Sequence, residues 1–374
     1  MELLVFTNDI SNGWFFNQPF LFICSMKMLD FIIVGNGLAA LAFAEVLLQN
    51  NCSFVVFGDS KLKSSRVAAG LYNPLIVKRY RPLQDAVDQI DFLRSFYSRA
   101  EQRLCAKFHH EKLTLRKFVS IAEQNDWFEH ADKPQLANLL SNDLFTSAIE
   151  GIDSPFQYGV VNYTGHLDTN VFITKYQTFL ADSGCFIAES FIYADLEFSS
   201  EFVTYHEFQA SNVIFAEGYG VNQNPYFNFV SVPGTKGEGI TIHAPQLKLT
   251  EIINSGVFIL PLGNDLFKVG ATYEWTDKTE QTTAAAREEL TMRLKQVIQC
   301  DFEIVDQWAG VRPTTPDRKA IVGNHPQFPQ LHILNGLGTR GVMLGPTMAK
   351  LLYDHIVDKK EIPTYLQAKR FWKQ

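Results

Sequence analysis

The chain contains little cysteine, and its cysteines are not grouped. Five occur in 374 residues, and no two form a C-x-x-C pair. An odd, scattered set argues against a disulfide framework and against a structural zinc site. We therefore expect reduced thiols, a cytoplasmic location and no bound metal. The cysteines are Cys24, Cys52, Cys105, Cys185 and Cys300.

Long apolar runs are also missing. No stretch reaches the roughly eighteen apolar residues that a membrane span requires, so we expect no membrane span. The first 25 residues have acids near their start and no basic segment of the kind that opens a secretory signal peptide. We expect residues 1–27 to form an N-terminal extension ahead of a fold that begins near Met28.

The chain has fewer basic residues than acidic ones. Lysine and arginine total 33 against 40 acids, which gives a net charge of −7. This balance argues against general nucleic-acid binding. A local cluster at Lys78, Arg79 and Arg81 has two interpretations: it is solvated, or it meets an anionic substrate at the mouth of a site. A 46% hydrophobic content predicts a globular chain, long enough for two lobes.

A glycine-rich turn lies between a predicted strand and a predicted helix. Residues 31–34 are apolar strand formers, expected to be buried on both faces of a parallel sheet. Gly35 permits the tight turn, Gly37 lets a pyrophosphate approach the backbone, and Ala40 lets the helix lie close to the strand. Free N–H groups at the helix start favour phosphates. The predicted cradle consists of Gly35, Asn36, Gly37, Leu38, Ala39 and Ala40.

The next predicted strand ends at an acid. "SFVVF" is followed by Gly58 and Asp59, and Asp59 lies 24 residues beyond Gly35. An acid near this spacing binds the ribose hydroxyls in dinucleotide folds, so we predict that role for Asp59. The alternative is an ordinary turn between a strand and a helix in an α/β core.

The rest of the chain predicts an α/β fold with a second lobe that combines helices and strands. Apolar spacing predicts helices over residues 83–104, 169–184, 282–299 and 342–357, and a hairpin that turns at Gly263, Asn264 and Asp265. Helix–strand alternation predicts a doubly wound nucleotide domain. Antiparallel-looking segments such as "FKVGATYEW" predict an inserted sheet domain, and "CFIAESFIY" is a further predicted strand.

Three later segments extend the glycine motif into a family pattern. They are "SSRVAAGLYNP" at 64–74, "VIFAEGYG" at 213–220, and "WAGVRPTTPDRKAIVG" at 308–323 with "LHILNGLGTRGVMLGPTMAKLLYDHI" at 331–356. In this order they resemble the D-amino-acid oxidase superfamily of FAD enzymes. The glycine oxidase and sarcosine oxidase branch is the most similar. The resemblance covers nearly all of residues 28–356.

The resemblance implies a Rossmann-like FAD-binding domain with an inserted antiparallel-sheet substrate domain. The FAD-binding domain would comprise residues 28–85, 160–230 and 304–374. The substrate domain would comprise residues 86–159 and 231–303. Some relatives attach flavin to a cysteine near "GVRPTTPD", where this chain has none, so the resemblance implies non-covalent FAD.

The resemblance also implies individual cofactor contacts. They are Ser65, Arg66, Ala69, Gly70 and Leu71 beside the flavin; Glu217 and Gly218 near the adenosine; and Gly310, Arg312, Gly336, Gly338, Thr339, Arg340, Gly341 and Val342 around the isoalloxazine ring. Apart from the family, "GLGTRG" places several N–H donors at a helix start, where they can stabilise negative charge. The alternative is a plain glycine-rich loop.

Arg312 is the main candidate for substrate binding. A planar guanidinium can hold a carboxylate through two parallel hydrogen bonds, and the resemblance implies this role within "GVRP". The alternative is a structural salt bridge. Arg340 and Tyr273 complete the predicted catalytic set. Tyr226, Lys236 and Glu274 are further candidates on the substrate side. A catalytic role for His166 and a metal role for His109 and His110 are not expected.

The implied reaction oxidises a C–N bond of an amino acid or secondary amine by hydride transfer to flavin N5. Oxygen or another electron acceptor would then reoxidise the flavin. Two alternatives stay open. One is a flavin enzyme that acts on a methylaminomethyl-uridine-type amine carried by tRNA, with the basic cluster contacting phosphate. The other is a flavin- or nucleotide-binding protein without catalysis.

Overall fold

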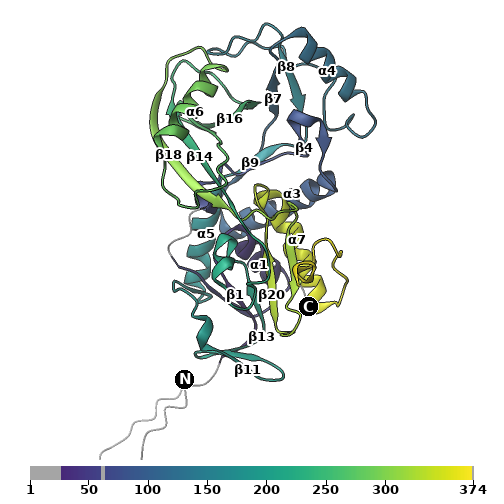
Figure 1. Ribbon diagram of the computed structural model, residues 1–374, viewed down its shortest axis with the longest axis vertical. Coiled ribbons are helices and arrows are strands. Elements are labelled where there is room, and N and C mark those ends of the chain that lie inside the picture. The colour runs from purple at the N-terminus through teal and green to yellow at the C-terminus, as the bar shows by residue number, and fades with distance from the viewer. Residues whose placement is uncertain (1–26, 60–63, 373–374) are drawn as a thin grey trace, which may run out of the picture.

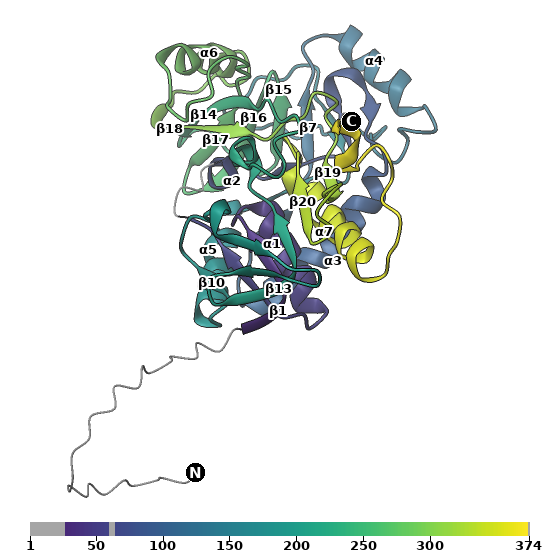
Figure 2. The ribbon, with the colours of Figure 1, turned by 60° about the horizontal axis from the view of Figure 1, so that its bottom comes forward.

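The computed structural model describes residues 27–59 and 64–372. All but the last residue of the expected N-terminal extension lies outside this range. Two large sheets occupy opposite ends of the molecule, and the chain passes between them several times (Figures 1 and 2).

An eight-stranded sheet is built around β1 (Lys27–Val34). This strand pairs in parallel with β2 (Phe54–Phe57) on one side and with β13 (Phe208–Phe215) on the other. Ile32 and Ile33 are fully buried, as the unbroken apolar run predicts for a strand covered on both faces. The other strands are β10 (Phe186–Ile187), β11 (Leu196–Phe198), β12 (Val203–Tyr205), β19 (Ile321–Asn324) and β20 (Leu331–Asn335).

Four helices enclose one core of this sheet. The helices α1 and α7 pack closely. A Cβ built on Gly345 of α7 would lie only 3.6 Å from the Cβ of Ala42 in α1. Packing of this kind stabilises an amphipathic or apolar helix more than its intrinsic propensity does. The four helices are α1 (Leu38–Gln49), α3 (Ala86–Leu104), α5 (Thr169–Asp182) and α7 (Gly341–Val357).

A seven-stranded sheet forms the other end, in the order β18-β14-β17-β16-β15-β7-β8. Helix α6 (Ala284–Lys295) packs on its core, and α4 (Ile121–Ala131) buries Trp127 beside it. The strands are β7 (Thr114–Lys117), β8 (Tyr158–Val161), β14 (Thr235–His243), β15 (Ile252–Ser255), β16 (Val257–Gly263), β17 (Leu266–Gly270) and β18 (Glu303–Arg312).

Short elements connect the two ends. A three-stranded sheet contains β3 (Leu71–Tyr72), β9 (Gly165–Leu167) and β6 (His109–Glu111), and a two-stranded one contains β4 (Leu75–Ile76) and β5 (Arg81–Pro82). One short helix and four 3₁₀ turns complete the described elements. They are α2 (Ser64–Val67), η1 (Val77–Arg79), η2 (Tyr193–Asp195), η3 (Gly218–Gln223) and η4 (Ala368–Phe371).

The predicted α/β architecture with a second sheet-rich part is confirmed. The predicted strand "CFIAESFIY" was too long: only Phe186–Ile187 pairs, because Phe191 leaves the sheet to stack on Tyr205. The segment after Gly270 was predicted as strand and is a loop. Two elements lie apart from their expected domains: β18 belongs to the seven-stranded sheet, and α3 packs against α7. The domain boundaries therefore stay a proposal.

None of the helices in residues 27–59 and 64–372 is both long enough and apolar enough to cross a membrane. The same part of the chain contains no group of three histidine, cysteine, aspartate or glutamate side chains placed to hold a metal ion.

Candidate functional site

One cavity of about 1980 Å³ runs between the two sheets. Both glycine-rich turns, the carboxyl ends of β1, β2 and β13, and the ends of β17 and β18 line it. Ligand pockets for small molecules usually measure about 300–1,000 Å³. This cavity therefore has room for a dinucleotide together with a second, smaller molecule.

The turn between β1 and α1 forms one wall of the cavity. Gly35 has a positive φ of 112°, and a Cβ there would lie 2.4 Å from the carbonyl oxygen of Ala216, so only glycine fits. Gly37 is the N-cap of α1 and provides no side-chain cap, and no acid occupies the first turn. In contrast, side chains cap α4, α5 and α6. The N–H of Leu38 donates to the Ser65 hydroxyl at 3.3 Å, and the rest of the positive end of α1 is left open toward the cavity.

Asn36 explains why the expected acid stands one position late. Its side-chain amide donates to the carbonyl oxygen of Asp59 at 2.9 Å. A Cβ on Gly58 would lie 2.5 Å from Cγ of Asn36, so any side chain at position 58 would displace this amide. The acid therefore follows at Asp59, which lines the cavity and accepts from the Ser190 hydroxyl at 3.1 Å.

Glu217 follows β13 and places a carboxyl group on the cavity wall. The hydroxyl of Tyr193 and the side-chain amide of Asn224, the latter at 2.8 Å, both donate to it. Burial raises the pKa of Glu217 to about 7, although both hydrogen bonds act in the opposite direction. This carboxyl group therefore titrates near neutral pH.

The loop between β20 and α7 forms a second glycine wall. Gly336 and Gly338 have φ values of 69° and 56°, and the N–H of Gly338 donates to the carbonyl of Pro313. Arg340 is the N-cap of α7 and provides no side-chain cap. Its guanidinium donates to the carbonyl of Arg318 at 2.8 Å. Burial, followed by proximity to Arg318, lowers the pKa of Arg340.

Arg312 ends β18 inside the cavity. Its Nη1 lies 3.3 Å from the carbonyl oxygens of Lys236 and Thr272, and its guanidinium stands 4.7 Å above the ring of Tyr273. The guanidinium occupies the space over Gly237, where a Cβ would come within 2.0 Å of Nη2. No acid forms an ion pair with Arg312 among the described residues, and burial lowers its pKa. Among the described residues, the site therefore holds a partly buried cation that has no acidic counter-ion.

Three candidates on the substrate side lie away from the cavity lining. The ammonium group of Lys236 is buried against Asp277 at 2.5 Å. The backbone of Glu274 pairs with that of Lys236, and Tyr226 donates to the carbonyl of Tyr193. These predicted substrate contacts are corrected to supporting positions. Tyr273 does line the cavity.

Two predicted cofactor contacts also lie outside the lining. Arg66 donates to Thr174 and Gln177 on α5, so its guanidinium points away from the cavity. Ala40 is fully buried within α1 and serves the packing of the helix on the sheet. The other predicted residues line the cavity: Gly35, Asn36, Gly37, Leu38, Ala39, Asp59, Ser65, Ala69, Gly70, Leu71, Glu217, Gly218, Gly310, Arg312, Gly336, Gly338, Thr339, Arg340, Gly341 and Val342.

Sequence reasoning missed Lys268 on β17, which lies outside the lining but contacts two residues of it, Ala68 and Trp308. Its ammonium group lies 4.7 Å from the centre of the Trp308 ring and donates to the carbonyl of Ala68 at 3.1 Å. Burial lowers the pKa of Lys268 to about 8. Lys268 could have been noticed from the sequence, because it is a lysine within the predicted strand "LFKVG" at a position where an apolar residue is expected.

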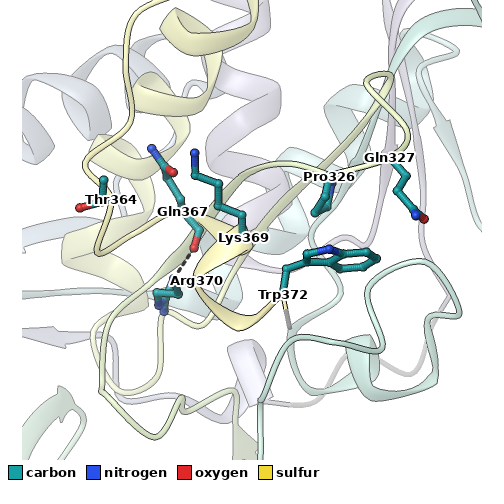
Figure 3. A pocket seen from close by; sticks show the side chains of 7 residues that line it. All are labelled: Pro326, Gln327, Thr364, Gln367, Lys369, Arg370 and Trp372. Atoms are coloured by element: carbon teal, nitrogen blue, oxygen red, sulfur yellow. Dashed lines mark hydrogen bonds between the residues drawn. The ribbon is translucent and has the colours of Figure 1, made fainter. Parts of the chain in front are cut away.

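Two features lie away from the lining of this cavity. His109 accepts or donates at the Tyr72 hydroxyl at 2.9 Å, and His110 stacks on His166, so these rings are parts of packed layers. A second hollow has a volume of about 690 Å³. Figure 3 shows its lining, in which Arg370 donates to the carbonyl of Gln367. Among the residues that the structure describes, no carboxylate, histidine or thiol lines that hollow.

Comparison with known proteins identifies the family. The sequence model described as "FAD dependent oxidoreductase" (DAO) matches residues 30–355. The chain belongs to this family.

The relatives of this FAD-dependent oxidoreductase include two proteins of different roles. Glycine oxidase of Bacillus subtilis is 27% identical over 36% of the chain and 37% of that protein. The "tRNA 5-methylaminomethyl-2-thiouridine biosynthesis bifunctional protein MnmC" of Legionella pneumophila is 26% identical over 38% of the chain and 26% of that protein. The chain therefore matches well under half the length of each relative.

A solved structure supports the fold. Glycine oxidase from Geobacillus kaustophilus superimposes with a TM-score of 0.73 at 19% identity, over 92% of this chain and 99% of that one.

The residues that line the cavity fit FAD, the cofactor of the family. An extended dinucleotide needs N–H groups for its pyrophosphate and hydrogen-bonding groups for its ribose and flavin edges. The cavity offers two glycine-rich helix starts without side-chain caps, at Gly37 and Arg340, and two strand-end acids, Asp59 and Glu217. Both helix starts open toward the same space, as the fit requires.

Proposed function

We propose that this oxidoreductase oxidises the C–N bond of a small amino acid or N-substituted amino acid, with non-covalently bound FAD. The observation that carries the proposal is Arg312, a partly buried guanidinium without an acidic partner among the described residues, inside the cavity that fits the cofactor. A substrate carboxylate would supply the missing counter-ion. An oriented pair of this kind is a common use of arginine in binding sites.

The chain's own residues would orient the substrate. Arg312 would bind the carboxylate through two N–H groups. The ring of Tyr273, which lies beneath the guanidinium, would keep the guanidinium in a fixed orientation. When bound, FAD supplies the electron acceptor that takes a hydride from the carbon beside the nitrogen. Water would hydrolyse the resulting imine, and oxygen or another acceptor would complete the cycle.

Backbone N–H groups would assist from the opposite wall. The loop at Gly338 and the uncapped start of α7 present donors to the cavity. Such donors stabilise negative charge that develops during a reaction, and they require no rearrangement. We assign Arg340 to this loop as a supporting residue, because its guanidinium is engaged with the carbonyl of Arg318.

Substitution of Arg312 tests the substrate class. We expect Arg312→Ala to raise the apparent dissociation constant of an amino-acid substrate by about two to three decades, because it strands a buried carboxylate. The measurement is anaerobic bleaching of the flavin by an amino acid and, separately, by its decarboxylated amine. The amine should lose little affinity, and the flavin spectrum should stay nearly unchanged.

Two variants sharpen this test. Arg312→Lys keeps the charge but loses the planar fork, so it should remain damaging. Gly237→Ala leaves Arg312 in the sequence but places a methyl group where its guanidinium lies, so it should reproduce the same selective loss. Equal losses for amino acid and amine in all three variants would contradict a carboxylate clamp.

One observation favours a second candidate, an amine carried on tRNA. Lys78, Arg79 and Arg81 line the cavity mouth, where they could contact an RNA phosphate. Anaerobic bleaching by tRNA that carries a methylaminomethyl-uridine, but not by free amino acids, would support this candidate over the first.

A further inference from the structure

The turn between β4 and β5 places three cations at the cavity mouth. Lys78, Arg79 and Arg81 are all exposed, and all line the cavity. None forms a hydrogen bond or ion pair through its side chain among the described residues. Other lining cations are already engaged: Arg116 pairs with Glu123, and Lys278 donates to backbone carbonyls.

The backbone of this turn is fixed by contacts of Val77 and Tyr80 with the rest of the protein. Val77 is 7% exposed and belongs to the core beneath α4. Tyr80 adopts a left-handed conformation, with a φ of 47°, and its ring stacks on His130 at 4.1 Å between centroids. Ile76 pairs with Arg81 across the two strands. Val77 and Tyr80 therefore anchor the backbone of the turn, while the three cationic residues are exposed.

The charge balance at the mouth favours an anion. Beyond the three cations of the turn, Arg293 adds a positive side chain to the lining, although it pairs with Glu289. Over the whole lining, ten lysines and arginines stand against six acids. Cations therefore outnumber acids along the cavity, in a chain whose net charge is −7. A local excess against the overall sign raises the concentration of anions at this opening.

We infer that the turn Val77–Arg81 is a second anion subsite, and that the substrate carries a second anionic group, a carboxylate or a phosphate, distal to the one on Arg312. This inference rests on the proposed function and extends it to a dianionic substrate class. Three cations within four positions suit one small anionic group. A nucleic acid would need a broader surface, since such footprints commonly neutralise about six to ten phosphates.

Binding of non-oxidisable anions tests the subsite without turnover. The probes are butyrate, succinate and 3-phosphonopropionate, which share a short chain and differ in the second group. Titration calorimetry on the purified protein, as it carries its cofactor, gives each dissociation constant. We expect one or both dianions to bind about ten- to a hundredfold more tightly than butyrate, and added salt to narrow that gap. The tighter of the two identifies carboxylate or phosphate as the second group.

A triple variant assigns the effect to the turn. Replacing Lys78, Arg79 and Arg81 by glutamine should remove the dianion advantage and leave butyrate binding unchanged. The matched control replaces one lysine and two arginines that are exposed and lie outside the cavity lining, namely Lys175, Arg99 and Arg287. It should retain the advantage.

The outcomes separate this inference from the proposed function. Equal affinity for monoanion and dianions, an advantage that survives in the triple variant, or an advantage lost equally in the control overturns the subsite. If butyrate binds in an Arg312-dependent way while the dianions gain nothing, the carboxylate clamp stands and the subsite fails. If no probe binds, the subsite fails, and flavin bleaching by amino acids judges the proposed function separately.

Discussion

At the scale of single residues, Glu217 makes stability depend on pH. Its folded pKa of about 7 lies above the ordinary value of 4.5, because burial disfavours the charged form. Because the folded pKa is raised, the neutral carboxyl group of Glu217 stabilises the folded protein. This stabilisation is fully present below about pH 4.5 and is lost as the pH rises through about 7. The free energy of unfolding of the apo-protein should therefore fall across this window because of Glu217.

Glu217→Gln tests this expectation. The amide keeps the shape of the neutral acid and does not ionise, so the variant should lose the decline between pH 4.5 and 7. The difference in the free energy of unfolding is about 3–4 kcal/mol at most, at about 1.4 kcal/mol per pKa unit. Urea unfolding of apo wild type and variant at pH 5, 6, 7 and 8 measures it. Parallel profiles for the two proteins would contradict the assignment.

Residue roles could be predicted from the sequence where the backbone dictates them. Gly35 was predictable because its turn excludes any side chain, and the structure shows the clash that enforces it. The relation of Asn36 to Gly58 was not, since it depends on two loops that meet across the sheet. Arg66 was misplaced for a similar reason: nothing local indicates that Thr174 and Gln177, more than a hundred residues later, hold its guanidinium.

At the scale of elements, a loop between β17 and α6 closes one side of the cavity. It brings Tyr273 and Trp275 to the lining. It is held to β14 by the ammonium group of Lys236, which contacts Asp277 and the carbonyl of Gln281, both at 2.5 Å. The side chain of Lys236 is only 1% exposed, whereas that of Asp277 is 37% exposed, so water reaches this attachment from the aspartate side only. The loop is thus fixed at its middle, beside Arg312.

Removing the attachment should loosen the loop. We expect Lys236→Met to raise the apparent dissociation constant of the substrate and to expose the loop to cleavage after Lys278, with flavin content unchanged. Lys248→Met is the matched control, because it breaks an exposed pair with Asp265 that should contribute about 0–1 kcal/mol. Limited proteolysis and anaerobic titration of both variants measure the effects. Equal protease sensitivity in the two variants would refute the role of Lys236.

Helices and long strands were predictable from apolar periodicity, as α3, α6 and α7 illustrate. Short strands were not. The strands β6 and β9 contain three residues each and pair with each other across more than fifty residues of sequence. Such strands are defined by their partners, so a local pattern carries little information about them.

At the scale of the molecule, FAD should couple the two ends of the chain energetically. Ligand that binds only the folded state stabilises it by about 2.7 kcal/mol at a hundred times its dissociation constant. We expect that gain for wild type on addition of FAD. Gly37→Val should abolish it and leave apo stability nearly unchanged, because position 37 has extended backbone angles that valine tolerates. Urea unfolding with and without FAD measures both. An equal gain in the variant would place the pyrophosphate elsewhere.

The parallel pairing of β1 with β13 and of β13 with β20 has a consequence for synthesis on the ribosome. The first glycine turn emerges early, yet the strand that supports Gly35 follows about 180 residues later, and the second glycine turn lies beyond residue 335. Local contacts form before such distant ones. The nascent chain must therefore carry an incomplete nucleotide cradle through most of translation, and cofactor loading becomes a late event that follows emergence of the last helix.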